Sequence, residues 1–152
     1  MTLEEMFCDL YDKYGKDFNW YMIPFTQADG AFVAELNKEI GQDHFLYGKK
    51  IWAVAKCESN DDVLYVLRNG IGRDIYYLFH LTYSAQNADG FPRYEEFADL
   101  FAVKEFIERI IYRGLYVTFK FQFIGNLPYP QWQQKGGGRH VNLERNPKQT
   151  GK

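Results

Sequence analysis

The stretch Ile-Tyr-Tyr-Leu-Phe-His-Leu-Thr-Tyr, residues 75–83, is the strongest strand signal in the chain. Aromatic and β-branched residues dominate it and no Gly, Pro or acidic residue interrupts it, which predicts a central strand of a sheet. Its two alternating sets of residues are both largely apolar. We therefore expect other elements to cover both faces of the sheet at least in part.

Two further strand-like runs precede this stretch, at residues 51–57 and 63–69. The loops between the runs are too short for a crossover connection, so the runs must be antiparallel neighbours. In the second loop, Asn69 and Gly70 are residues that tolerate a positive φ angle. The sequence therefore predicts a β-meander over residues 51–83.

Two other segments are candidates for edge strands. Residues 115–124 alternate between apolar and polar side chains, which predicts a half-buried strand at an edge of the sheet. Residues 18–25 are aromatic but contain Pro24, so they fit either an edge strand or an irregular packed segment.

Residues 91–97 carry aromatic side chains that need a surface to receive them.

Two helices are indicated by apolar residues at helical spacing. Residues Leu3–Tyr14 follow a capping box formed by Thr2 and Glu5, and Gly15 suits the end of the helix. Residues 99–113 begin with Asp99 as N-cap and precede Gly114 as a C-cap. The apolar stripe of this helix, which should cover one face of the meander, consists of Val103, Phe106, Ile107, Ile110 and Ile111.

Residues 31–40 favour a third helix, although their β-prone beginning leaves a strand as the alternative. The apolar face would consist of Phe32, Val33, Leu36 and Ile40, and the opposite polar face of Glu35, Lys38 and Glu39. The predicted fold class is therefore α+β: an antiparallel sheet of about four or five strands, with about three α-helices packed on it.

The chain is long enough for one globular domain, which we place at residues 1–134. Residues 135–152 form a basic, Gly-rich tail that we expect to be flexible. The sequence contains no apolar run long enough to span a membrane, and Cys8 and Cys57 share no metal or redox motif. These features predict a cytoplasmic protein with reduced thiols and no membrane association.

Charge is divided unevenly along the chain. Residues 1–134 contain 13 Lys/Arg and 19 Asp/Glu, a net charge of −6, whereas residues 135–152 contain 5 Lys/Arg and 1 Glu, a net charge of +4. An acidic body repels nucleic-acid phosphates and attracts basic partners. The charge distribution therefore disfavours nucleic-acid binding except through the tail.

The sequence contains no arrangement of residues typical of a catalytic, cofactor or metal site. His80 lies in the predicted central strand, where a packed or hydrogen-bonded histidine is the simplest interpretation. A catalytic role would require Cys57 or a carboxylate such as Asp62 to meet His80 across the sheet. We therefore predict no catalytic residue, no metal and no cofactor.

A non-enzymatic protein-binding domain is the function that these observations favour. A small acidic domain has the general character of the immunity proteins and antitoxins that neutralise basic effectors. The predicted binding surface consists of Glu58, Asp61, Asp62, Tyr94, Glu95 and Glu96.

Two other functions and an assembly remain open. A small-ligand-binding protein or an enzyme would have a pocket against the aromatic sheet, near His80 and Tyr76. A nucleic-acid-binding protein would depend on residues 135–152. A homodimer is compatible with each function, because a second copy could cover an aromatic face of the sheet.

Overall fold

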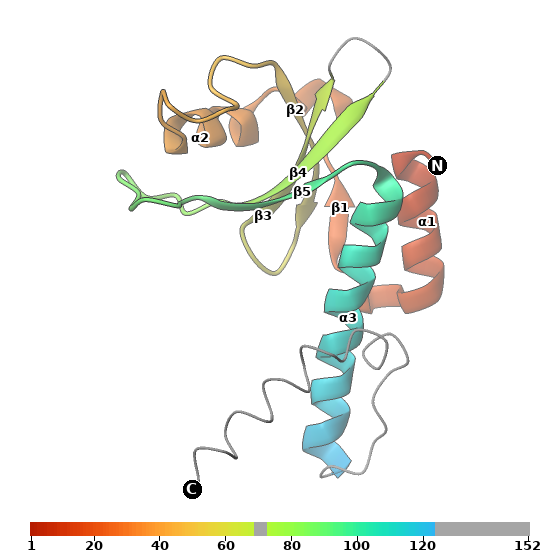
Figure 1. The fold of residues 1–152 in the computed structure, drawn as a ribbon. Coiled ribbons are helices and arrows are strands. Elements are labelled where there is room, and N and C mark those ends of the chain that lie inside the picture. The colour runs from red at the N-terminus through yellow and green to blue at the C-terminus, as the bar shows by residue number, and fades with distance from the viewer. Residues whose placement is uncertain (69–72, 124–152) are drawn as a thin grey trace, which may run out of the picture. The chain divides into compact units, whose positions relative to one another are not determined.

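A computed structural model describes residues 1–68 and 73–123, with side chains described as far as Leu115 (Figure 1). Within these residues the fold is α+β, as predicted: a five-stranded antiparallel sheet with three α-helices. The helices are α1 (Leu3–Tyr14), α2 (Ala31–Glu39) and α3 (Leu100–Phe123). The strands are β1 (Trp20–Met22), β2 (Ile51–Cys57), β3 (Asp62–Arg68), β4 (Asp74–His80) and β5 (Arg93–Phe97).

The chain divides into two compact units, Met1–Ile111 and Tyr112–Lys152, and the sheet belongs to the first. The predicted domain boundary at residue 134 and the predicted tail, residues 135–152, lie outside the described residues.

The strand order in the sheet is the sequence order, β1-β2-β3-β4-β5. The predicted meander is confirmed in β2, β3 and β4, and residues 18–25 contribute β1 at one edge. β3 holds the middle position, while β4 lies between β3 and β5. The strand predicted at residues 75–83 is therefore interior, but it ends at His80 rather than at residue 83.

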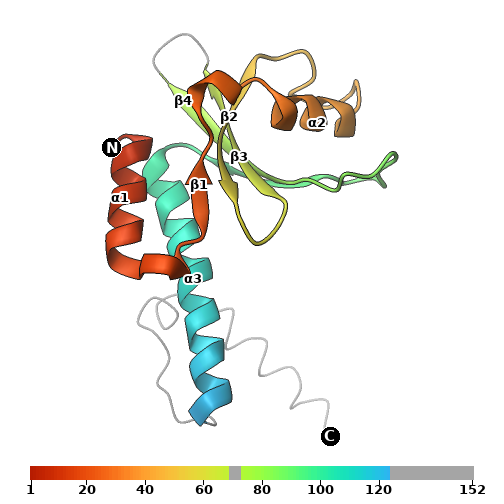
Figure 2. The same ribbon diagram turned by 180° about the vertical axis from the view of Figure 1, so that it is seen from behind.

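Both faces of the sheet are covered, as its apolar strands require. Figures 1 and 2 show α2 on one side of the sheet and α1, with the first turns of α3, on the other. The core under α2 includes Leu36, Leu46, Val63, Tyr65, Tyr77 and Phe79. Met6 and Leu10 of α1 and Val103 and Ile107 of α3 are also almost fully buried. Successive side chains of a strand point to opposite faces of the sheet, so alternate residues pack against α2 on one face and against α1 and α3 on the other.

α1 has the cap that its sequence predicts. The Glu5 N–H donates to the Thr2 hydroxyl at 3.1 Å, and the Thr2 N–H donates to the Glu5 carboxylate at 2.9 Å. Gly15 ends the helix with a φ of 58°, a conformation that glycine adopts without a steric penalty. The capping box therefore satisfies backbone donors that a helix start leaves unpaired.

The strand predicted at residues 115–124 is wrong, because α3 continues through Gly114 to Phe123. Gly114 lies within this helix rather than capping it, and its φ is outside the positive range. A strand needs the backbone groups of a neighbouring strand, whereas a helix satisfies its own. Residues 115–123 therefore form their hydrogen bonds within α3 and not with a strand of the sheet.

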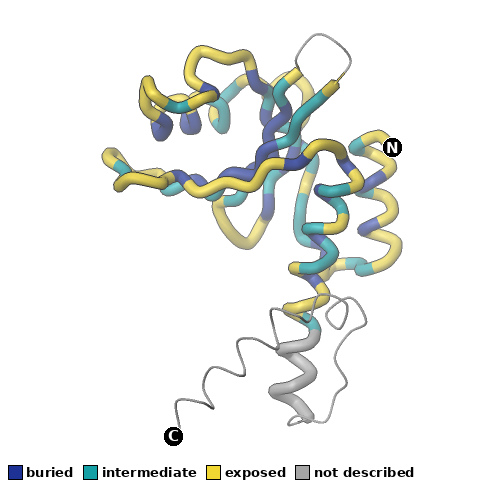
Figure 3. Tube along the Cα trace, viewed as in Figure 1, coloured by how far each residue is buried: buried dark blue, intermediate teal, exposed yellow. Residues whose placement is uncertain are grey.

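β5 is the element that the sequence analysis does not assign. It pairs with β4 along its full length, with Arg93 opposite His80 and Phe97 opposite Tyr76. Only Phe97 of its five residues is buried, and Figure 3 shows the strand as a largely exposed edge. Three charged residues in a five-residue strand hide the apolar alternation that would otherwise have revealed it.

Candidate functional site

The six residues of the predicted binding surface fall at two places. Tyr94, Glu95 and Glu96 lie on the edge strand β5, whereas Glu58, Asp61 and Asp62 lie in and next to the β2–β3 turn. β4 separates β3 from β5 in the sheet, a distance of roughly 10 Å. The structure therefore does not gather all six residues into one compact site.

Within β5, neighbouring residues face opposite layers. Tyr94 is opposite Phe79 and Glu96 is opposite Tyr77, and both of these partners belong to the core under α2. Glu95 is opposite Leu78 and therefore lies on the other face. Tyr94 and Glu96 consequently share one surface with the loop that follows α2.

An aromatic cluster, defined as His44, Phe45, Tyr77, Phe79 and Tyr94, connects this surface to the core. The Tyr94 ring stacks on Phe79 at 5.2 Å between centroids and lies 5.4 Å from Phe45. Tyr77 and Phe79 are buried, whereas Phe45 and Tyr94 are 43% and 40% exposed. The cluster thus presents two aromatic side chains at the surface from a rigid, buried base.

His44 supports the loop that carries Phe45. The Leu46 N–H donates to His44 Nδ1 at 3.1 Å, and the His44 ring stacks on Phe45 at 4.5 Å. Burial lowers the pKa of His44, which favours the neutral ring that this hydrogen bond requires. The position of Phe45 is therefore fixed by packing and by a backbone hydrogen bond.

Asp62 and His80 meet across neighbouring strands, which is the contact that a catalytic role of His80 was expected to require. Asp62 is opposite His80 in the β3–β4 ladder, and Asp62 Oδ1 lies 2.5 Å from His80 Nδ1. A carboxylate on Nδ1 orients an imidazole and leaves Nε2 as the free nitrogen. Cys57 does not join them, because its thiol contacts Asn19 and Ser59 instead.

The β2–β3 turn is shaped by its own polar groups. Lys56 Nζ donates to the carbonyl oxygens of Cys57 and Asn60, and the Asp62 N–H donates to Asn60 Oδ1 at 2.9 Å. The Glu58 N–H donates to the Asn19 carbonyl at 2.8 Å. Glu58 and Asp61 are exposed on this turn, whereas the Asp62 carboxylate contacts the His80 ring.

A groove of about 590 Å³ lies between the start of α1 and the sheet. Tyr76 contributes to its wall together with Arg68 and Asp74, and the remaining lining is largely apolar. Burial, followed by the negative charge of Asp74, raises the pKa of Tyr76. His80 is not part of this groove, so the two residues of the predicted pocket lie apart.

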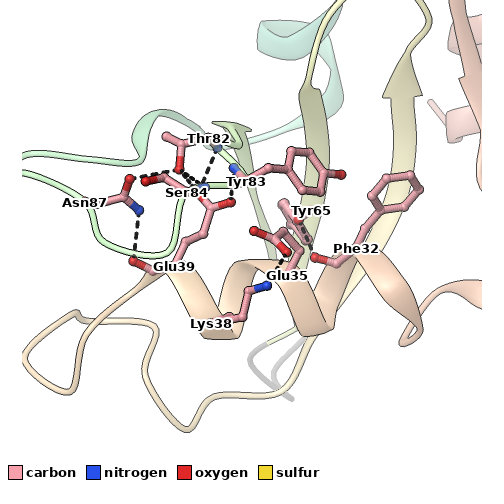
Figure 4. A network of polar contacts seen from close by, with 9 residues as sticks. All are labelled: Phe32, Glu35, Lys38, Glu39, Tyr65, Thr82, Tyr83, Ser84 and Asn87. Carbon is pink, nitrogen blue, oxygen red and sulfur yellow. Dashed lines mark hydrogen bonds and ion pairs between the residues drawn. The ribbon is translucent and has the colours of Figure 1, made fainter.

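A buried acidic network that the sequence analysis does not anticipate joins α2 to the segment after β4 (Figure 4). The Glu39 carboxylate accepts hydrogen bonds from the Thr82 N–H at 2.9 Å, the Thr82 hydroxyl at 3.0 Å and the Tyr83 N–H at 2.8 Å. Glu35 and Glu39 are only 9% and 7% exposed. The prediction that they form a solvent-facing side of α2 is wrong.

The two carboxyl groups of this network have opposite pKa shifts. Hydrogen bonding to the Glu39 carboxylate, and then burial, raise the pKa of Glu35. Burial by itself would raise the pKa of Glu39, but hydrogen bonds from Glu35, Thr82 and Tyr83 outweigh it and lower that pKa. Glu35 therefore holds its proton more readily, and Glu39 is the carboxylate that anchors the chain after β4.

The spacing of these residues contains the signal that would have found the network. Glu35 follows Phe32 by three residues, and Glu39 follows Leu36 by three residues. Both glutamates therefore lie within the same helical stripe as the apolar side chains. Tyr83, which Glu39 holds, has a φ of 53°, a left-handed conformation that is uncommon for an aromatic residue. A structural role, fixing the chain after β4, explains the network without invoking chemistry.

In the part of the chain that the structure describes, no group of three or more His, Cys, Asp or Glu residues is arranged to hold a metal ion. The helices of that part also include none with the length and apolar character needed to cross a bilayer. Comparison of the chain with protein-family models, curated proteins and solved structures found no match.

Proposed function

We propose that this protein is a non-enzymatic binding domain for a basic protein, of the kind by which an immunity protein or antitoxin neutralises its effector. The binding surface is a patch on and beside β5, here called the β5 patch and defined as Phe45, Tyr94 and Glu96; Glu95 of the same strand faces the other side of the sheet. Cytoplasmic location belongs to the same proposal, and the free thiols of Cys8 and Cys57 agree with a reducing compartment.

The observation that carries the proposal is the contact of Tyr94 and Phe45 at the surface, on the face of β5 that also carries Glu96. Aromatic side chains on a rigid base are the common anchors of protein interfaces, because they bury much area and lose little conformational freedom. A neighbouring carboxylate pairs with Lys or Arg, and the aromatic faces attract the same cations. The chemistry of the patch therefore fits a basic partner.

The charge of the surrounding unit supports the same class of partner. Residues 1–111 contain 11 Lys/Arg and 19 Asp/Glu, which gives a formal net charge of −8. A field of this sign accelerates the encounter with a basic protein and disfavours nucleic acid. Glu58 and Asp61, on the β2–β3 turn, contribute to this field from outside the patch.

The test is affinity capture from lysate of the source cells, with the full-length chain as bait. We compare wild type with the double variant Tyr94→Ala, Glu96→Lys, and use Asp12→Lys, on the exposed side of α1, as a control for added positive charge. The proposal expects a basic protein on wild type and on the control but not on the double variant. Equal recovery by all three baits, or recovery of no basic protein, would refute it.

The two alternative functions involve other parts of the chain. A small ligand would bind in the groove that Tyr76 lines. His80, which an enzyme would use there, is not part of this lining. Nucleic-acid binding through residues 135–152 stays a prediction, because those residues lie outside the described part of the chain.

A further inference from the structure

We infer that β5 binds its partner as an added β-strand, and that the occupant is an extended basic segment with adjacent Lys or Arg residues followed by an apolar residue. This inference rests on the proposed function and specifies the form of the partner. It concerns the backbone edge of β5 as well as its side chains.

The first step is the open edge. β5 pairs with β4 on one side only within the described residues, and its first four residues are exposed. Alternate residues of an edge strand direct their N–H and C=O groups away from the sheet, where another strand can pair with them. The opposite edge is less suitable, because β1 has three residues and Pro24, two positions beyond it, has no N–H to donate.

The second step compares a basic strand with a second copy as the occupant. In the two-fold antiparallel register that overlaps all five residues of β5, Glu95 faces Glu95 of the second copy. Like charges directly opposite each other destabilise a sheet, so this register is disfavoured. The same carboxylates stabilise a basic strand, which gives the edge its selectivity.

The third step is the order of side chains that the edge selects. In an antiparallel strand added to β5, a residue opposite Glu96 and a residue opposite Tyr94 lie on the α2 side, next to the aromatic cluster. A residue opposite Glu95 lies on the other face. The complementary order is therefore a cation opposite Glu96, a cation opposite Glu95 and an apolar side chain opposite Tyr94.

The experiment titrates the full-length, isotope-labelled protein with the end-blocked peptide Thr-Lys-Lys-Val-Thr and follows the amide signals by NMR. Two further peptides have the same sequence and charge but carry N-methyl groups on one or the other set of alternate residues. Only one of these two sets points its N–H groups toward β5, so the second N-methylated peptide is the matched control.

The expected result has three parts. One N-methylated peptide binds about tenfold more weakly than the parent, while the other binds like the parent. Amide hydrogen exchange within Arg93–Phe97 slows by about tenfold or more at saturating parent peptide. Glu95→Gln and Glu96→Gln each weaken binding by about two- to fivefold, which is the range of exposed ion pairs.

Equal binding of all three peptides, or no slowing of exchange in β5, would overturn the inference. Absence of peptide binding by the wild-type protein would also overturn it. Each of these outcomes leaves the proposed function standing if the capture experiment retains a basic protein through Tyr94 and Glu96. Failure of the capture experiment is therefore distinguishable from failure of strand addition.

Discussion

At the scale of single residues, the buried Glu35–Glu39 pair is where charge and packing compete most directly. The pair divides its roles, because the pKa of Glu35 is raised and that of Glu39 is lowered. Glu35 contributes stability below its ordinary pKa of 4.5, and this contribution is lost as pH rises through its folded-state pKa. Glu39 contributes stability above 4.5, and this contribution is lost as pH falls through its folded-state pKa.

Substitutions at the two positions should therefore have opposite effects on stability. Glu35→Gln cannot ionise, so we expect it to raise the free energy of unfolding at pH 7 by about 1 kcal/mol and to lose this advantage near pH 4. The lost ion pair with Lys38 costs little, because the Lys38 side chain is 69% exposed.

Glu39→Gln weakens the bonds to Thr82 and Tyr83, so we expect it to lower stability by about 2 kcal/mol at pH 7 and by less near pH 4. Urea unfolding of both variants at the two pH values checks the signs. A loss of stability in Glu35→Gln that is the same at both values would contradict the assignment of the proton to Glu35.

At the scale of elements, β5 and the second half of α3 are the parts that the sequence did not predict. Residues 115–123 alternate like a strand, but Ile107, Ile111, Leu115, Phe119 and Phe123 also recur every four residues. The residues fit both a period of two and a period of four, so the pattern alone does not distinguish a strand from a helix. In β5, exposed charges at Arg93, Glu95 and Glu96 conceal the period of two.

The helical assignment of this segment can be tested at Gly114. Gly114 is exposed in α3, and among the described residues a Cβ atom placed there would meet no atom within 4 Å beyond its chain neighbours and the backbone of its own helix. We expect Gly114→Ala to stabilise the helix by about 1 kcal/mol, because alanine loses less backbone freedom than glycine. Thermal unfolding followed by circular dichroism measures the change. Destabilisation would indicate that Gly114 has the positive φ of a helix end, as the sequence analysis proposed.

The elements that were predicted share a physical reason. The capping box of Thr2 and Glu5, the short loops of the meander and the buried stripe of α3 each depend on contacts that are close in sequence. Val103, Ile107 and Ile111 of that stripe are buried as predicted, whereas Ile110 is exposed. The candidate site depends on contacts between distant segments. The contact of Phe45 with Tyr94 places the loop after α2 against β5, which no pattern near either residue indicates. The contact of Asp62 with His80 depends on the register of β3 and β4, and the sequence analysis names these two residues only as a possible pair.

At the scale of the whole molecule, we assign binding to the β5 patch and not to the net charge of the unit. The −8 charge of residues 1–111 acts at long range and should mainly raise the rate of association, with an effect that salt screens. Tyr94, Phe45 and Glu96 act at contact distance and should mainly slow dissociation. Two variants that change the net charge equally, but at different positions, separate the long-range effect of charge from the effect of contacts at the β5 patch.

The most direct measurement is the affinity of the captured basic protein for wild type, Glu96→Lys and Asp12→Lys, determined by calorimetric titration at low and at physiological salt. The two variants change net charge equally, and Asp12 lies on the exposed side of α1. We predict that Glu96→Lys weakens binding by at least about tenfold at both salt concentrations, while Asp12→Lys stays within about twofold of wild type at physiological salt. Equal weakening by the two variants would contradict the assignment of binding to the β5 patch.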